Sequence, residues 1–140
     1  MAITFTNTIY EDVMESLATL INDEFSIPVY YDEHKPPQSF LLTPQSDNLV
    51  THLSSGMERA YEIEINYQLK SGGQYTKNNM KQVSNIMERL KRLIFNNISY
   101  SSGVKWFDAG IISIEYERDE DDESLLRGIG IFNCTNIETT

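Results

Sequence analysis

The stretch Tyr61-Glu62-Ile63-Glu64-Ile65-Asn66-Tyr67-Gln68-Leu69 decides the fold class, because apolar and polar residues alternate along all of it. Successive side chains of a β-strand point to opposite faces, so the pattern predicts one long strand whose odd-numbered residues face a core. The even-numbered residues would then face water or a partner. Ser71-Gly72-Gly73 follows and predicts the end of the strand.

Amphipathic helices are predicted on either side of this strand along the chain. Thr8 and Glu11 have the spacing of a capping box, and apolar residues then recur at steps of three and four, which predicts a helix over residues 10–25. The same periodicity from Met80 to Ile94 predicts a second, longer helix over residues 76–97. Each helix has an apolar stripe that we expect to pack on the sheet.

Shorter strand patterns complete the predicted sheet. Residues 29–31 and 40–42 are expected to pair as a bent hairpin, with the double proline of Lys35-Pro36-Pro37 in its turn. Three later segments are predicted as the last strands of an antiparallel sheet: 104–107, 112–117 and 125–134. This order of elements predicts an α+β fold, a mostly antiparallel sheet with two helices packed on one face.

The chain has the length of one domain, with 140 residues and a mass of 16.1 kDa. We expect residues 1–140 to form a single α+β domain. The polar segment 43–56 has no clear periodicity and is predicted as a long functional or flexible loop. The C-terminal tail 136–140 is expected to fray.

Charge is unevenly distributed along the chain. The 21 acidic and 11 basic residues give a net charge of −10, which disfavours independent binding to nucleic acid. Five of the basic residues lie in the second predicted helix: Lys77, Lys81, Arg89, Lys91 and Arg92. They form either a solvated outer face or a local basic surface for a partner.

No group of residues in the sequence has catalytic spacing. No Ser or Cys stands in a Gly-x-Ser-x-Gly context, and neither Asp32-Glu33-His34 nor His52 has a second motif to fix its geometry. Gly128-Ile129-Gly130 lacks the third glycine of a dinucleotide-binding loop, so we expect a bulge or a close backbone approach there. The single Cys134 can form neither an internal disulfide nor a cysteine-based zinc site. We therefore predict no enzyme, no cofactor and no metal site.

A membrane location is not predicted either. The longest apolar runs are only a few residues, and residues 1–7 have neither a basic segment nor a continuous apolar one. We expect a protein that is made and used in a cytoplasm.

Two oppositely charged segments suggest assembly. Residues 117–123 hold six acids in seven positions and are predicted as an exposed hairpin tip, or as a negatively charged surface of an assembly. A ring of identical subunits could join this tip to the basic helix head to tail. The predicted interface residues are Lys81, Arg89, Arg92, Asp119, Glu120, Asp121 and Asp122, with Glu62 and Glu64 expected to line the lumen.

The order of parts resembles that of the tail-terminator, or tail-completion, proteins at the neck of tailed bacteriophages. The resemblance covers the opening helix, the segment Ile27-Pro28-Val29-Tyr30-Tyr31 leading into a strand, and the Phe40-Leu41-Leu42 strand. A polar loop, the long strand, the second helix and a closing strand pair follow. The segment 43–56 and the acidic hairpin have no family residues that match them.

The resemblance implies a structural virion protein, assembled in the cytoplasm of a host bacterium. A hexameric ring would cap the tail tube, contacting the tail tube protein on one face and a head-completion protein of the neck on the other. DNA would pass through its lumen. The acidic balance suits that implied role, because an acidic lumen repels DNA and lets it slide.

Two other functions stay open from the sequence. A small cytoplasmic α+β ligand-binding or enzymatic domain would use a pocket lined by Tyr30, Tyr31, Tyr61 and Tyr67. A free-standing adaptor would bind one partner through the basic helix.

Overall fold

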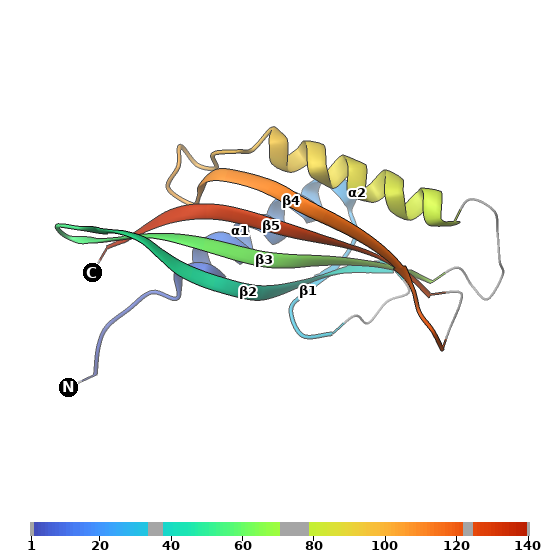
Figure 1. The fold of residues 1–140 in the computed structure, drawn as a ribbon, viewed down its shortest axis with the longest axis horizontal. Coiled ribbons are helices and arrows are strands. Elements are labelled where there is room, and N and C mark those ends of the chain that lie inside the picture. Colours follow the sequence, from blue (N-terminus) through green and yellow to red (C-terminus); the bar gives the residue numbers. More distant parts are fainter. Residues whose placement is uncertain (1, 34–37, 71–78, 122–124, 140) are drawn as a thin grey trace.

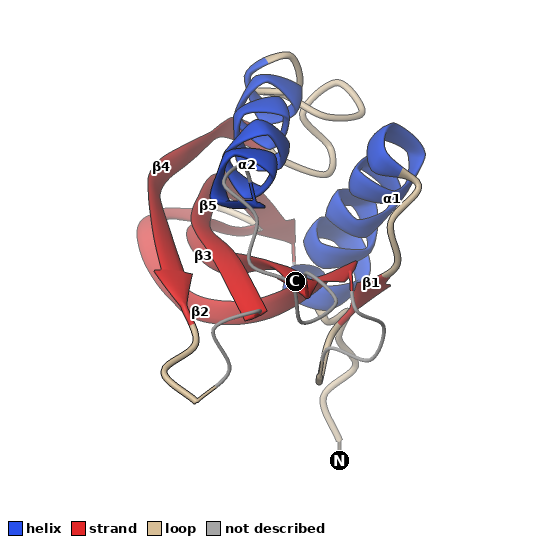
Figure 2. Cartoon of the chain, turned by 90° about the vertical axis from the view of Figure 1, so that its right-hand side faces the viewer, coloured by secondary structure: helices blue, strands red, loops and turns tan. Residues whose placement is uncertain are grey.

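The computed structural model describes residues 2–33, 38–70, 79–121 and 125–139, which form a five-stranded sheet with two helical segments on one face (Figures 1 and 2). Across the sheet the strands are β1 (Val29–Tyr30), β2 (Gln38–Leu53), β3 (Gly56–Lys70), β5 (Leu125–Thr139) and β4 (Phe107–Arg118). All neighbours are antiparallel except β1 and β2. The predicted α+β class is therefore confirmed.

The first helical segment covers the predicted range. It begins as a π-helical stretch, η1 (Ile9–Met14), and continues as α1 (Glu15–Phe25). Its first turn is not closed by Thr8, whose side chain makes no capping bond; instead the Glu11 carboxylate accepts a hydrogen bond from the backbone N–H of Asn7 at 2.9 Å. The helix ends at Ser26, which adopts a left-handed conformation with φ 55°.

The second helix, α2 (Asn79–Phe95), packs on β4 and β5 through its apolar stripe. Val83, Met87, Leu90 and Ile94 are fully buried along it. The predicted start of this helix lies outside the described residues. Gly128 of β5 lets α2 come close, because a Cβ atom built there would lie 2.6 Å from Cγ of Met87. The expected close backbone approach at Gly128 is confirmed.

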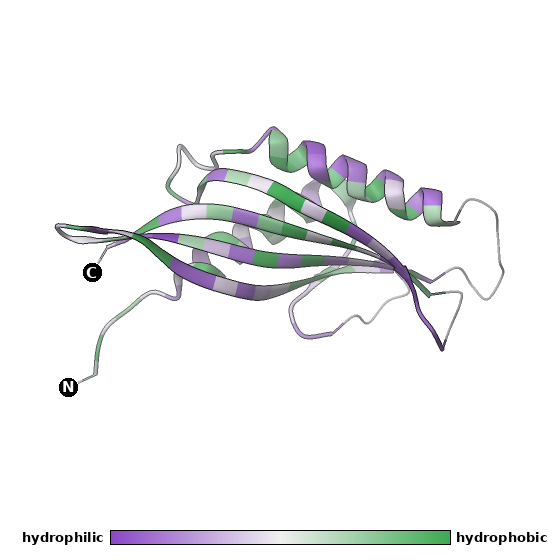
Figure 3. Cartoon of the chain, in the orientation of Figure 1, coloured by the Kyte–Doolittle hydropathy of each residue, from purple (hydrophilic) through white to green (hydrophobic). Residues whose placement is uncertain are grey.

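The core lies between the sheet and the two helices. Tyr61, Ile63, Ile65 and Tyr67 of β3 are at most 1% exposed, which confirms the predicted inward face of that strand. Figure 3 shows the alternation of apolar and polar residues along the strands. Trp106 is fully buried, donates a hydrogen bond from Nε1 to the backbone oxygen of Asn97 at 2.8 Å, and fixes the connection between α2 and β4.

The loop predicted over residues 43–56 is wrong. β2 continues to Leu53 and pairs with β3 down to the contact of Leu53 with Gly56, so the two strands form a long hairpin (Figure 1). Two irregularities, between Pro44 and Ser46 and between Leu49 and Thr51, shift its register. Each irregularity adds one residue to β2, so the side chains that follow it point to the opposite faces of the sheet. The sequence of β2 therefore has no continuous period-two pattern.

The hairpin predicted between residues 29–31 and 40–42 is also wrong. β1 pairs with β2 in parallel, Val29 with Phe40 and Tyr30 with Leu41. The expected proline turn lies outside the described residues. A strand of two residues has too short a pattern to indicate its direction.

Three smaller corrections concern the last strands. The segment 136–139 does not fray but continues β5, and Asn136, only 2% exposed, donates from Nδ2 to the backbone oxygens of Val104 and Lys105. β4 begins at Phe107, so most of the predicted strand 104–107 precedes it. A register shift between Ile111 and Ser113 leaves Ile112 55% exposed, which breaks the predicted alternation there.

Candidate assembly interface

One whole face of the sheet has no helix on it among the described residues, because η1, α1 and α2 all lie on the opposite side (Figure 2). The pleat and the strand register place alternate residues of four strands on this face. We call it the open face and define it by Leu41, Thr43, Glu58, Glu62, Glu64, Asn66, Ser113, Glu115, Ile129, Ile131 and Asn133.

The open face has an aliphatic pair between rows of acids. Ile131 lies beside Glu64 on β3 and Ser113 on β4, and Ile129 lies beside Asn66 and Glu115. Both isoleucines are partly exposed. A lone domain gains nothing from leaving isoleucine at the surface, whereas a docked partner would bury it.

Acidic side chains of the open face lack basic partners among the described residues. Among the described residues, Glu62, Glu64 and Glu115 take part in no ion pair. Oδ1 of Asn66 is buried and accepts no hydrogen bond from any described residue. An unmet buried acceptor is destabilising, so this position of the open face costs the lone domain stability.

The basic residues predicted for the interface lie on α2, with different surroundings. Lys81 is exposed and has no ion pair among the described residues. Arg92, whose side chain is 68% exposed, pairs with Glu88 one turn away, as does Lys91 at 2.9 Å. Hydrogen bonds from Lys91 and Arg92 lower the pKa of the Glu88 carboxyl. Arg89 turns toward α1, where it pairs with Glu24 at 3.1 Å.

The acidic hairpin does lie at the turn between β4 and β5, whose pairing extends to Arg118 and Leu126. Part of its charge is neutralised within the chain, since Arg127 pairs with Glu117 at 3.4 Å and with Asp119 at 3.3 Å. Glu120 and Asp121 are exposed, and Asp122 lies outside the described residues. The tip therefore has an internal cation, Arg127, that Glu62 and Glu64 of the open face do not have.

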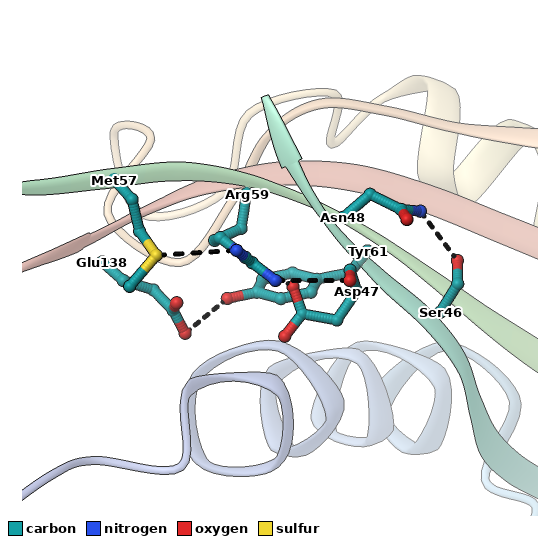
Figure 4. Close-up of polar contacts among 7 residues, drawn as sticks. All are labelled: Ser46, Asp47, Asn48, Met57, Arg59, Tyr61 and Glu138. Carbon is teal, nitrogen blue, oxygen red and sulfur yellow. Dashed lines mark hydrogen bonds and ion pairs between the residues drawn. The ribbon is translucent and has the colours of Figure 1, made fainter. Parts of the chain in front are cut away.

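A polar cluster that the sequence analysis missed lies on the helix side of the sheet, where the β2–β3 hairpin leaves the core (Figure 4). Arg59 of β3 pairs with Asp47 of β2 at 2.7 Å, and the hydroxyl of Tyr61 donates to Glu138 of β5 at 2.7 Å. Burial, followed by the hydrogen bond to Glu138, raises the pKa of the Tyr61 hydroxyl. These bonds tie three strands together. The mistaken loop over 43–56 hid the pairing of Asp47 with Arg59.

The tyrosine pocket considered from the sequence does not form. Tyr61 and Tyr67 are buried in the core, while Tyr30 and Tyr31 line an open cavity of about 570 Å³ beside α1. A second cavity, of about 600 Å³, lies between residues 3–8 and the ends of β3 and β5.

Other reactive groups are inert or isolated. Among the described residues, no three His, Cys, Asp or Glu side chains are grouped closely enough to hold a metal ion. Burial raises the pKa of the Cys134 thiol to about 12. No helix in the described part of the chain is both long and apolar enough to cross a membrane.

No protein-family model matches the chain, and no curated protein matches it. Among solved structures, it is similar to a chain of one described as "Virion of native gene transfer agent (GTA) particle". The two are 11% identical, with a TM-score of 0.46, over 94% of this chain and 89% of that chain. This likeness is too distant to define what the chain does.

Proposed function

We propose that this chain is a non-enzymatic structural subunit of a phage-like particle. In particular, it is a neck protein that forms a ring, ends the tail tube and joins it to head-completion proteins while DNA passes through. The open face carries this proposal. It combines partly exposed isoleucines with glutamates that have no ion-pair partner among the described residues.

The order of elements supports the same role. An opening helix, a long central strand, a second helix and a closing strand pair are among the parts on which the resemblance to tail terminators rests, whereas the polar loop of that resemblance is the continuation of β2. The net charge of −10 per copy fits a ring through which duplex DNA slides, since an acidic lumen does not hold phosphates.

Electron microscopy of the purified protein tests this function. The proposal predicts closed rings with a central channel. It also predicts that a titration with duplex DNA shows no binding near 0.15 M salt. Isolated single copies that bind DNA tightly, with affinity falling steeply as salt rises, would instead support an adaptor acting through α2. A variant with Lys81→Glu and Arg92→Glu would then lose that binding.

A further inference from the structure

We infer that the open face of one copy is covered by the outward, basic side of α2 of the next copy. This inference rests on the proposed function, because it names the contact that builds the ring. It goes beyond the sequence-based expectation by pairing the basic helix with Glu62 and Glu64 instead of with the acidic hairpin tip. Those two glutamates then lie in a subunit contact and not in the lumen.

The two surfaces point in opposite directions on one copy. α2 packs on the sheet through Val83, Met87, Leu90 and Ile94, so its charged side faces away from the sheet. The open face is the other side of that same sheet (Figure 2). A copy therefore presents a helix on one side and a bare sheet on the other, which is the arrangement that head-to-tail assembly requires.

The charges of the two surfaces favour the same contact between the open face and α2. The open face has Glu58, Glu62 and Glu64 along β3 and Glu115 on β4, and its cation Arg127 is already paired with Glu117, so two open faces would repel each other. Two α2 surfaces, each with Lys81, Lys91 and Arg92 against Glu88, would repel as well. Contact between unlike surfaces is the favourable combination.

The dimensions of the two surfaces agree. Eleven helical residues separate Lys81 from Arg92 by about 16 Å along the axis of α2. Six strand residues separate Glu58 from Glu64 by roughly 20 Å along β3. A helix lying along β3 would bring both cations within side-chain reach of the glutamate row.

Apolar and polar contacts accompany the charges. Phe95, at the end of α2 and 71% exposed, supplies an aromatic ring for the exposed aliphatic surface of the sheet. Asn85, exposed on the same side of α2, adds an amide that can hydrogen-bond to polar groups of the open face.

A mixing experiment with charge-reversal variants tests the contact. One variant has Glu62→Lys and Glu64→Lys, and the other has Lys81→Glu and Arg92→Glu. Each alone opposes like charges at every contact, so its oligomer should be lost and only monomer found by native mass. In an equimolar mixture, every contact between one variant and the other joins unlike charges, so an oligomer in which the two variants alternate should form.

Controls separate the contact from folding and from the function. Circular dichroism and thermal melting verify that both variants fold. Asp23→Lys with Glu33→Lys makes the same change of net charge as Glu62→Lys with Glu64→Lys, at exposed positions outside both surfaces, and should assemble like the wild type. The inference is overturned if either variant assembles alone, or if the mixture stays monomeric while the wild type is oligomeric; the ring function would then survive. A monomeric wild type would overturn both.

Discussion

Arg89 of α2 binds Glu24 at the end of α1. Its Nη2 atom donates both to Oε1 and to the backbone oxygen of Glu24 at 3.1 Å, and its guanidinium lies 4.6 Å from the centre of the Phe25 ring. The two helices are thus joined side by side on the sheet. Arg89 serves the fold of one copy, which leaves Lys81 and Arg92 as the cations most available to a neighbour.

Arg89→Ala should lower the free energy of unfolding by about 0.5–1 kcal/mol, because an exposed ion pair and a cation–π contact are lost. Urea unfolding measures the change. Arg92→Ala is the matched control: it loses an ion pair within one helix, so a smaller change is expected. Equal losses in the two variants would show that the bridge between the helices adds nothing.

Ile65→Asp should unfold the chain, with a loss above about 4 kcal/mol, because Ile65 is fully buried and an unpaired charge would enter the core. Its neighbour Glu64 lies on the open face, so at a concentration low enough for the wild type to be monomeric, Glu64→Lys should change the free energy of unfolding by less than about 0.5 kcal/mol. Thermal melting of both compares the two faces of β3. A large loss in Glu64→Lys would mean that the faces are assigned the wrong way round.

Gly128→Ala should cost about 1–3 kcal/mol, since the added Cβ meets Cγ of Met87 at 2.6 Å and Cγ1 of Val83 at 3.1 Å. The Met87 and Val83 side chains must then shift, which disturbs the packing of α2 on β5. Gly110→Ala is the control, because its Cβ would come no nearer than 3.7 Å to Oδ1 of Asn133. If chemical unfolding gave the two alanine variants the same stability, the close packing of α2 on β5 would be refuted.

Long, regular elements could be predicted from the sequence, and irregular ones could not. The inward face of β3 and the buried stripe of α2 were found because their periodicity is unbroken over several turns or residue pairs. The continuation of β2 was not predicted, because the one-residue shift after Pro44 breaks the alternation that identifies a strand. β1 is too short to have a pattern at all.

Only some residues of the candidate interface could be predicted from the sequence. The alternation of β3 predicted Glu62 and Glu64 on an outer face, but Ile129 and Ile131 join them only through the pairing of β3 with β5, which is remote in sequence. In the same way, only the structure shows that Arg89 is engaged by Glu24 and that Asp119 is engaged by Arg127. Ion pairs between distant segments leave no local pattern.

The buried Cys134 thiol should make stability fall at alkaline pH. Burial raises its pKa from an ordinary 9.0 to about 12, so above pH 9 the unfolded chain releases a proton that the folded chain keeps. The contribution is fully present below pH 9 and is lost progressively toward pH 12. At pH 10.5 this amounts to about 2 kcal/mol.

Urea unfolding at pH 8 and pH 10.5, for the wild type and Cys134→Ala, isolates the thiol from other titrating groups. The wild type should lose more stability between the two pH values than the alanine variant does. Parallel losses in both proteins would show that the thiol is not shielded in the folded state.

Native mass across a concentration series tests the central claim, that this chain is a subunit built to assemble with its own copies. The open face and the basic side of α2 predict one discrete homo-oligomer above a threshold concentration, of the size of a closed ring. They also predict that raising the salt concentration weakens it, since unlike charges hold the copies together. A single species of 16.1 kDa at every concentration and at low salt would contradict the account.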